Sequence, residues 1–432
     1  MQADRSSSTT REQRTWHVWL VTDVYPPDCG GSGWSTHALA RVLTTHGHEV
    51  EVIAVDPSED DVTLREYEGI RVTDVGVRAS STLRNRLGAR DYAHARLARY
   101  LDGRLRAAPD VDILHAQHLH SSPPTLEVGR AHARATVATV RDYWPVCLHG
   151  TSWWGSSNCD GCTAGNLRHC MMEYWGWPAP VAGLMVRWAR RRLRARAEGL
   201  AVADKVLAVS EAVRSRVEGQ VLDADISVVT NIVDPETVWA DALPSDGRVE
   251  APYLLTAGKL QPTKGFDLLL RALGEIGSDL PLVVAGDGPL RDTLETTAAA
   301  LGVNARFLGW VDHGRLLGLQ RDAHAVLLPS AWQEPLSRLV LETMGLGTPV
   351  VAWATGGTPE IIKSGVNGWL VTRPADLRLA LAELESAERR EEVARASVAS
   401  VRERYSPTAV YPLVAAVYAA AMEKTRPHGP RA

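Results

Sequence analysis

The sequence has no run of about 18 or more apolar residues, the length that an α-helix needs to cross a membrane. The most apolar stretch, at 409–422, is short, rich in alanine and interrupted by Pro412. The first residues are polar and lack the cationic and then apolar pattern of a signal peptide. We therefore expect a cytoplasmic protein.

Cysteine is scarce and the charge is nearly balanced. Five cysteines in 432 residues are too few for a secreted scaffold held together by disulfides. Lysine and arginine total 47 against 51 aspartates and glutamates, whereas a nucleic-acid-binding protein normally carries a strongly basic domain. The composition thus argues against a nucleic-acid partner.

Two series of alternating strands and helices are present instead. The first begins with an apolar strand at 16–22, a Pro/Gly-rich loop at 25–33, a helical pattern at 34–46 and a strand at 49–55. This order is the βαβ unit of a parallel sheet. Further strands of this series are predicted at 111–114, 136–140, 206–209 and 226–229.

The second series follows a polar connector at 241–250. Its strands are predicted at 253–257, 282–285, 306–308, 325–328, 349–353 and 368–371, and its first helices at 265–273 and 290–301. Two such series predict two doubly wound α/β domains facing one cleft, with ligands beyond the carboxyl ends of the strands. The predicted organisation is a disordered tail at 1–15, a first domain at 16–240, a second at 251–404, and a helix at 405–432 that packs back on the first domain.

The strongest motif is Glu334-Pro-Leu-Ser-Arg-Leu-Val-Leu-Glu342. Pro335 fits the first turn of a helix, where its missing N–H costs nothing. The free amides at the helix start would then suit a diphosphate; they belong to Leu336, Ser337, Arg338 and Leu339. Glu342 lies about two turns further on, where its carboxylate can accept hydrogen bonds from both hydroxyls of a ribose. Taken alone, the motif is also explained by two surface glutamates on an amphipathic helix.

Glycines and lysines follow other strands of the same series. The segment at 258–265, GKLQPTKG, carries Lys259 and Lys264, whose ammonium groups would neutralise phosphate oxygens. Ala285-Gly-Asp-Gly-Pro289 and Thr355-Gly-Gly-Thr-Pro-Glu360 follow later strands, and Gly30-Gly31 lies in the first loop of the other domain. Each segment alone is explained by a structural turn. Their combination, in this order and spacing, is specific enough to indicate a family.

Together these motifs resemble those of the family 4 glycosyltransferases, retaining enzymes of the two-Rossmann (GT-B) architecture. The resemblance implies a nucleotide-diphospho-sugar donor held mainly by the second domain, and no cofactor or metal for catalysis. It implies that Lys259 and Lys264 bind the diphosphate and Glu342 the ribose. It also implies that Glu334 sits beside the donor sugar or its phosphate, and that Gly31 approaches the phosphates from the first domain when the cleft closes.

Two positions depart from the family pattern. Lys259 stands where the family usually has arginine. Its ammonium keeps the charge but cannot bind a phosphate through two parallel hydrogen bonds, as a guanidinium does. Arg141 stands where many members have a histidine that contacts the donor sugar. An arginine stays protonated and cannot act as a general base, but in front-face substitution the departing phosphate oxygen takes the acceptor's proton. We expect Arg141 to stabilise charge on the diphosphate or to bind an anionic acceptor.

Histidines follow the strand at 111–114 and are candidates to line the cleft: His115, His118 and His120, with His118 first. A polar loop of solvated histidines is the alternative. Asp110-Val-Asp112 matches the D-x-D pattern of metal-dependent transferases. It lies at the entry of its strand, the wrong end of the sheet for a ligand.

Residues 143–198 form an insert rich in cysteine and tryptophan. Its four thiols are Cys147, Cys159, Cys162 and Cys170, with one pair at the C-x2-C spacing. In a reducing compartment such a set favours a metal site, and a structural zinc fits; His149 or His169 could replace one thiolate. Four unconnected thiols, or an iron–sulfur cluster, are the alternatives.

The end of the insert, at 184–196, is an arginine-rich amphipathic pattern. Such a helix suits the headgroup region of an anionic membrane, which would place the protein on the inner membrane face and favour a lipid-linked acceptor. A solvated arginine face is the alternative, and a natural-product acceptor would equally suit the aromatic surfaces.

The sequence therefore predicts a retaining, metal-independent glycosyltransferase that transfers a hexosyl-type sugar to an acceptor hydroxyl. A nucleotide-sugar epimerase shares this architecture, and a non-catalytic binding subunit is kept open by Arg141. A dinucleotide-dependent dehydrogenase is disfavoured, because Thr36 stands where its fingerprint needs a third glycine-like residue.

Overall fold

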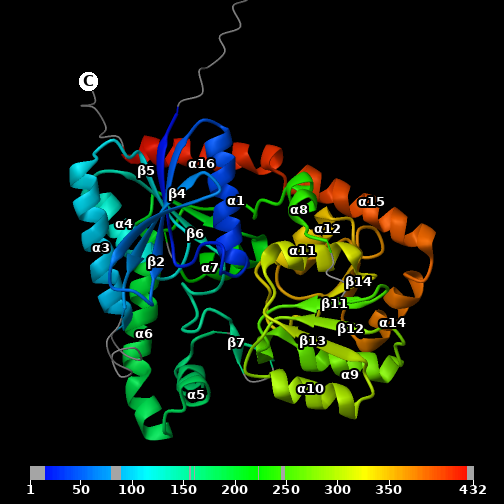
Figure 1. Ribbon diagram of the computed structural model, residues 1–432. Coiled ribbons are helices and arrows are strands. Elements are labelled where there is room, and N and C mark those ends of the chain that lie inside the picture. Colours follow the sequence, from blue (N-terminus) through cyan, green and yellow to red (C-terminus); the bar gives the residue numbers. More distant parts are fainter. Residues whose placement is uncertain are drawn as a thin grey trace, which may run out of the picture.

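The computed structural model describes residues 15–78, 89–154, 157–159, 161–221, 223–244 and 249–425. It has two α/β lobes, each built on one mainly parallel sheet, and the predicted fold class is confirmed (Figure 1). The predicted tail lies outside the described residues, apart from Thr15.

The first sheet has eight strands in the order β10-β9-β6-β5-β1-β2-β4-β3. They are β1 (His17–Thr22), β2 (Glu49–Asp56), β3 (Val62–Tyr67), β4 (Ile70–Gly76), β5 (Ile113–Ala116), β6 (Ala135–Val140), β9 (Lys205–Ala208) and β10 (Ile226–Val228). The flanking helices are α1 (Gly31–Thr45), α3 (Ala89–Ala107), α4 (Ser122–Ala131) and α7 (Glu211–Glu218). In β1, Val18 and Leu20 pack in one apolar cluster and Trp19 and Val21 in another. Burial on both faces explains the continuous apolar run of this strand.

The second sheet has six parallel strands in the order β13-β12-β11-β14-β15-β16. They are β11 (Leu254–Ala257), β12 (Leu282–Ala285), β13 (Ala305–Gly309), β14 (Ala325–Leu328), β15 (Val350–Trp353) and β16 (Trp369–Val371). The helices are α9 (Phe266–Ile276), α10 (Arg291–Ala300), α11 (His313–Asp322), α12 (Arg338–Gly345), α13 (Thr358–Ile361), α14 (Pro374–Glu383) and α15 (Ala387–Arg404). Strands β11 and β14 are neighbours at the centre, so the loops that follow them lie side by side.

Helix α16 (Pro407–Thr425) crosses from the second lobe and lies along the first (Figure 1). The Tyr418 hydroxyl lies 2.8 Å from Nδ1 of His115, and the Tyr411 hydroxyl lies 2.9 Å from Nε2 of His48. His115 is also 2.7 Å from the Thr139 hydroxyl and is fully buried. The prediction that His115 lines the cleft is therefore wrong, because its ring is part of the core under α16.

The insert forms helix α5 (Ala164–Trp175), helix α6 (Ala179–Ala201) and a short hairpin of β7 (Trp153–Trp154) and β8 (Ser157–Asn158). Leu148, Leu167, Met171, Ala182 and Ala189 make a separate small core between α5 and α6. The insert therefore has apolar packing of its own, beyond the lower edge of the first sheet in Figure 1.

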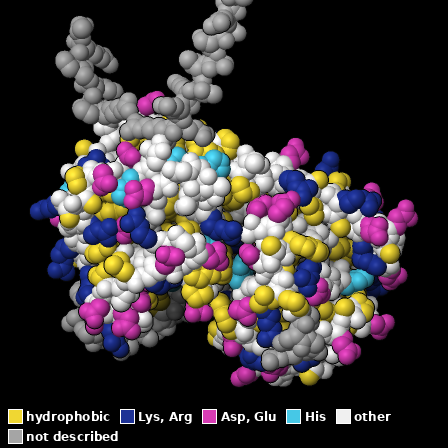
Figure 2. Space-filling model, turned by 45° about the horizontal axis from the view of Figure 1, so that its top comes forward, with side chains coloured by type: hydrophobic (Ala, Val, Ile, Leu, Met, Phe, Trp, Pro, Cys, Tyr) yellow, Lys and Arg dark blue, Asp and Glu magenta, His cyan; other side chains and the backbone are white. Residues whose placement is uncertain are grey.

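Direct contacts join the lobes beside the connecting helix α8 (Pro235–Asp241). The Ser210 hydroxyl donates to the carbonyl of Pro335 at 2.7 Å. The Glu360 carboxylate accepts from the amides of Glu211 and Ala212, at 2.9 and 2.8 Å, and so caps helix α7 of the other lobe. The glutamate of the TGGTPE segment thus holds the lobes together, and the surface is indented where they meet (Figure 2).

Candidate functional site

Helix α12 begins later than the sequence predicts. Its N-cap is Ser337, whose hydroxyl accepts a hydrogen bond from the amide of Val340 at 3.4 Å. Pro335 and Leu336 therefore lie in the preceding loop, and the prediction that Pro335 occupies the first turn is wrong. Serine is a better N-cap than the residues before it, because its hydroxyl satisfies a free amide. The amides of Arg338 and Leu339 remain at the positive end of the helix dipole.

The starts of α12 and α1 lie next to each other across the gap between the lobes. A Cβ atom built on Gly31, the first residue of α1, would be 3.3 Å from Cβ of Arg338. Gly30 precedes α1 and gives it no side-chain cap. Two helix N-termini thus converge from different lobes, which creates positive potential and free amides suited to an anion.

Glu334 is buried, at 7% exposure, and holds Lys264 in place. Its Oε2 accepts from Nζ of Lys264 at 2.9 Å, from the Ser330 hydroxyl at 2.7 Å and from Nε1 of Trp332 at 2.8 Å. Burial by itself would raise the pKa of Glu334, but the Lys264 ammonium and these hydrogen bonds outweigh it and lower the pKa. An ionised carboxylate therefore fixes the Lys264 ammonium beside the loop that leads into α12.

The glycine of the TGGTPE segment makes this arrangement possible. Gly356 has a φ of +54°, and a Cβ atom there would lie 2.2 Å from the carbonyl oxygen of Glu334. A larger residue would push the two loops apart. Gly356 thus allows its loop to pack directly against the backbone of Glu334.

Lys259 lies on the same loop as Lys264, after β11, and is exposed. Of the two, only Lys264 has a carboxylate partner among the described residues. Both ammonium groups follow the carboxyl end of a central strand of the second sheet, as the sequence predicts.

Glu342 is a buried carboxylate that lies four residues into α12 from Arg338. It is 3% exposed, and its Oε1 accepts from Nε2 of His313 at 2.8 Å and from Nε of Arg338 at 2.6 Å. Burial by itself would raise its pKa, but Arg338 and His313 outweigh this and lower the pKa to about 2. At neutral pH the group is therefore an ionised acceptor, as ribose hydroxyls require.

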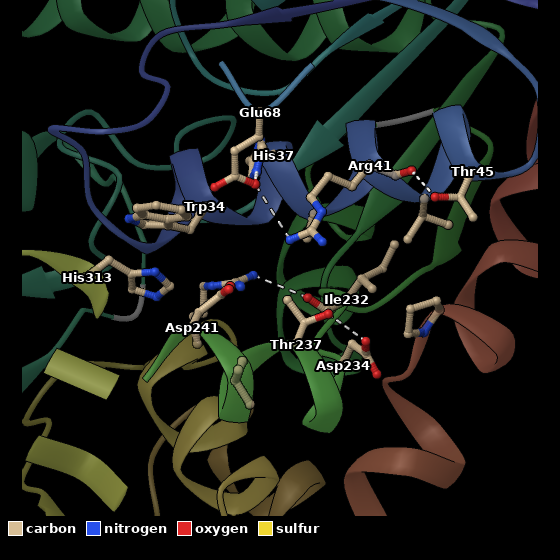
Figure 3. A pocket seen from close by; sticks show the side chains of 15 residues that line it. Trp34, His37, Arg41, Thr45, Glu68, Ile232, Asp234, Thr237, Asp241 and His313 are labelled. Atoms are coloured by element: carbon tan, nitrogen blue, oxygen red, sulfur yellow. Dashed lines mark hydrogen bonds and ion pairs between the residues drawn. The ribbon is translucent and has the colours of Figure 1, made fainter. Parts of the chain in front are cut away.

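An aromatic contact between the lobes lies beside Glu342. The Trp34 ring of α1 stacks on the His313 ring of α11, with centroids 3.9 Å apart and planes inclined by 23°. A cavity of about 220 Å³ opens next to this stack, and Arg41 and Asp241 approach it from α1 and α8 (Figure 3). Nothing in the sequence singled out His313, since its role depends on Glu342 and Trp34 lying beside it.

Arg141 and His118 lie at the carboxyl edge of the first sheet. Arg141 donates to Oδ1 of Asn231 at 2.5 Å and to Oε1 of Gln117 at 2.6 Å. Burial, with a contribution from Arg338, lowers the pKa of Arg141 to about 9, so it stays charged at neutral pH. Nδ1 of His118 is 3.0 Å from the Thr22 hydroxyl, and burial lowers the pKa of His118 to about 4, so its ring is neutral.

Asp142 is a titratable group that the sequence did not single out. Its Oδ1 accepts from the amide of Trp144 at 2.7 Å. Burial raises the pKa of Asp142 to about 7, although that hydrogen bond opposes the rise. Gly150 of the insert lies against this carboxylate, since a Cβ atom built on Gly150 would be 3.1 Å from Oδ1 of Asp142.

Asp112 has a structural role. Its Oδ2 accepts from the amide of His17 at 3.0 Å, at the entry of β5, so the D-x-D pattern lies at the edge away from the candidate site.

The four insert thiols are free, and two of them are in contact. The nearby Cys162 thiol and the backbone amides that include that of Ser152 lower the pKa of Cys147, whereas the Cys147 thiol and burial raise the pKa of Cys162. Within the described part of the chain, no three or more histidine, cysteine, aspartate or glutamate side chains are grouped as metal ligands. Zinc at Cys147, Cys159, Cys162 and Cys170 stays a prediction.

Helix α6 uses most of its apolar side chains internally. Met185, Trp188 and Leu193 pack against the small core of the insert, whereas Leu184 is 81% exposed. Arg196 is buried and donates to the carbonyls of Trp144, Cys147 and Leu148, so it cannot contact a membrane. The exposed arginines of the helix are Arg187, Arg190, Arg191 and Arg194. In the described residues, no helix is long and apolar enough to span a membrane.

Comparisons with known proteins agree with this architecture. Residues 29–237 match the model of Glycosyltransferase Family 4, and residues 244–400 match that of Glycosyl transferases group 1. Over 128 residues the chain is 41% identical to an uncharacterized glycosyltransferase of Methanocaldococcus jannaschii; this match covers 28% of the chain and only 33% of that relative. A longer match, 28% identical over 448 residues, covers 96% of the chain and 97% of the glycogen synthase of Mycobacterium tuberculosis.

The fold is also shared with a solved structure. Anabaena HepE in complex with UDP-glucose superposes with a TM-score of 0.64 at 17% identity, covering 93% of this chain and 99% of that one. With both halves matched and the two-lobed fold shared, the chain belongs to the glycosyltransferases of the GT-B architecture and has a family 4 N-terminal domain.

Proposed function

We propose that the protein transfers a sugar from a nucleoside diphosphate to an acceptor hydroxyl, with retention of the anomeric configuration. The observation that carries this is the convergence of two helix N-termini beside a fixed ammonium, Lys264, and an ionised carboxylate, Glu342. The UDP-glucose complex of the similarly folded HepE supports a nucleotide-sugar donor.

In this proposal the diphosphate binds at the starts of α1 and α12, with Lys259 and Lys264. Glu342 lies about 6 Å further along the axis of α12, a separation that suits a ribose attached to the phosphates. Because Glu342 is 3% exposed beside the Trp34–His313 stack, α1 and α11 would separate to admit the donor.

The chemical step needs charge stabilisation more than a base. As the bond between the sugar and the phosphate breaks, negative charge grows on the diphosphate, and Lys264 and the helix amides stabilise it. The departing phosphate oxygen takes the proton of the acceptor hydroxyl while the new bond forms on the same face of the sugar. Glu334 acts as a positioning residue, since its carboxylate contacts Lys264, Ser330 and Trp332.

The test is to incubate the protein with UDP- and GDP-sugars, with and without a panel of sugar, lipid and aromatic hydroxyl acceptors. Acceptor-dependent product whose anomeric proton coupling matches that of the donor supports the proposal. Inverted product contradicts retention. Epimerised sugar without an acceptor indicates an epimerase, and nucleotide binding without turnover indicates a binding subunit.

For the insert, we propose a structural zinc held by its four thiols and a membrane contact through α6. Metal analysis of the purified protein should find about one zinc per chain, and metal-free, folded protein contradicts the first proposal. The exposed arginines of α6 should retain the protein on vesicles that contain phosphatidylserine but not on neutral ones. Equal binding to both vesicles, or to neither, contradicts the second.

A further inference from the structure

Arg141 is a partly buried cation that has no carboxylate partner in the described part of the chain. Lys264 is paired with Glu334, and Arg338 is paired with Glu342. Arg141 donates only to the neutral amide oxygens of Asn231 and Gln117, and among the described residues no carboxylate lies within 4.0 Å of its guanidinium. The charged group that contributes to the lowered pKa of Arg141 is a second cation, Arg338.

Several polar atoms around Arg141 are buried and lack a hydrogen-bond partner among the described residues. They are Nε of Arg141, Nε2 of Gln117, Nε2 of His118 and Oγ1 of Thr230. Buried polar atoms are normally hydrogen-bonded, so each such exception requires an explanation. A small void of about 20 Å³ borders Arg141, Thr230 and Asn231 and extends into the core as far as His115 and Val414. Unpartnered polar groups beside an unneutralised cation are what an anion-binding site shows before its ligand arrives.

The cluster belongs to the first lobe but faces the donor site. Gln117 and His118 follow β5, Arg141 follows β6, and Thr230 and Asn231 follow β10, so all lie at the carboxyl edge of the first sheet. Nδ2 of Asn231 also donates to the carbonyl of Leu336 at 3.4 Å, directly before α12. A ligand group held here would therefore lie across the gap from the start of α12.

We propose that this cluster binds a carboxylate or phosphate group of the acceptor, and that Arg141 determines this specificity. The inference rests on the proposed function. A guanidinium binds either anion through two parallel hydrogen bonds, which a lysine cannot match. The diphosphate of the donor already has Lys259, Lys264 and two helix N-termini, so the acceptor is the substrate that lacks a cationic partner.

The test uses the whole protein saturated with UDP or, if it binds better, GDP. Calorimetric titrations compare glucose 6-phosphate, glucuronate and inorganic phosphate with uncharged glucose. We expect the anionic sugars to bind at least tenfold more tightly than glucose. Arg141→Gln should weaken their binding at least tenfold, and Arg141→Lys about fivefold, while the affinity for UDP changes less than twofold. Arg71→Gln is the matched control, because Arg71 is exposed and paired with Glu49 at the far edge of the sheet.

Three results overturn the proposal. If Arg141→Gln weakens the binding of UDP tenfold and leaves the affinity for the anionic sugars unchanged, Arg141 binds the donor diphosphate. If UDP-glucuronate binds tenfold more tightly than UDP-glucose only when Arg141 is present, the anionic group belongs to the donor. If the anions bind equally to wild type and Arg141→Lys, they are adventitious; this comparison decides the matter should Arg141→Gln fail to fold.

Failure of the proposed function gives a different pattern. No nucleoside diphosphate would then bind to any variant, whereas Arg141-dependent binding of the anionic sugars would persist without nucleotide.

Discussion

The cationic side chains at the carboxyl edges of the two sheets have different kinds of partner. In the second lobe two partly buried cations near the start of α12 each have a carboxylate partner, Lys264 with Glu334 and Arg338 with Glu342. In the first lobe the partners of Arg141 among the described residues are the neutral amides of Asn231 and Gln117, and the nearby His118 is neutral.

The two lobes therefore differ in whether their cations are neutralised before a substrate binds. An ion pair holds its side chains in fixed positions before the ligand binds. Such a preorganised site suits a ligand group that is the same in every reaction. An unpaired cation gains a partner only when the substrate supplies one, so it selects for charge. We therefore assign the constant part of the reaction, the nucleotide, to the second lobe and the variable part, the acceptor, to the first.

The largest expected effect comes from removing the fixed ammonium. Lys264→Ala should lower kcat by roughly 100- to 1,000-fold, since one group that stabilises developing charge contributes about that much. Turnover of a UDP- or GDP-sugar measures it. Glu334→Gln is the matched comparison. It keeps the Lys264 ammonium but removes the charged partner that holds it, so it should lower kcat by a smaller factor. If Lys264→Ala loses less than threefold, the charge pairing in the second lobe does not serve catalysis.

Glu342→Gln should weaken donor binding by about 10- to 100-fold, because hydrogen bonds to a charged group contribute roughly 1.5–3 kcal/mol. Calorimetry with UDP and GDP measures the affinity. Glu360→Gln is the contrasting variant, because the Glu360 carboxylate caps α7. This substitution should lower the free energy of unfolding by about 1 kcal/mol without weakening nucleotide binding. Equal nucleotide affinities for wild type and Glu342→Gln would remove Glu342 from the donor site.

Asp142 allows a stability test in the first lobe. Its folded pKa, about 7, lies above its ordinary value of 3.8, so the folded state binds the proton more tightly than the unfolded state does. Asp142 therefore lowers stability progressively as the pH rises from about 4 to 7, and by a constant amount above that.

Asp142→Asn keeps the oxygen that accepts from the amide of Trp144 and loses the charge. We expect it to raise the free energy of unfolding by about 1–2 kcal/mol at pH 8, and by less at pH 5. Thermal melts at both pH values check this. A variant that is less stable than wild type at pH 8 would show that the folded protein favours the ionised carboxylate.

The smallest expected effect concerns the contact between the lobes. Trp34→Ala removes the stack on His313, which contributes about 0.5–1.5 kcal/mol in such pairs. If the stack must open to admit the donor, nucleotide should bind the variant about two- to tenfold more tightly. Weaker binding to Trp34→Ala would mean that Trp34 contacts the nucleotide instead.

Much of the fold could be predicted from the sequence because its parallel strands are buried on both faces. Strands β12 and β14 begin and end at the predicted residues, since each is a short apolar run followed by a residue that interrupts a strand, Gly286 or Pro329. The hairpin of β3 and β4 was missed, because β3 is an edge strand with no buried residues and no apolar run.

The candidate site could be predicted only in part. The positions of Lys264, Glu334 and Glu342 follow from strand ends and helix starts. Their partners do not, because His313 and Trp34 come together through packing between the lobes. The burial that shifts the pKa of Asp142 and the pairing of Arg141 with the amides of Asn231 and Gln117 are likewise tertiary properties, which the local sequence does not reveal.

The most direct test of the central claim is a thermal-shift comparison of wild type and Lys264→Ala with UDP, GDP and their sugars. At about a hundred times its Kd, a ligand of the folded state adds about 2.7 kcal/mol of stability, enough to raise Tm by several degrees. We predict such a rise for at least one nucleoside diphosphate with wild type, and its loss in Lys264→Ala. No rise with any of them, or the same rise in both proteins, would contradict a diphosphate site between the lobes.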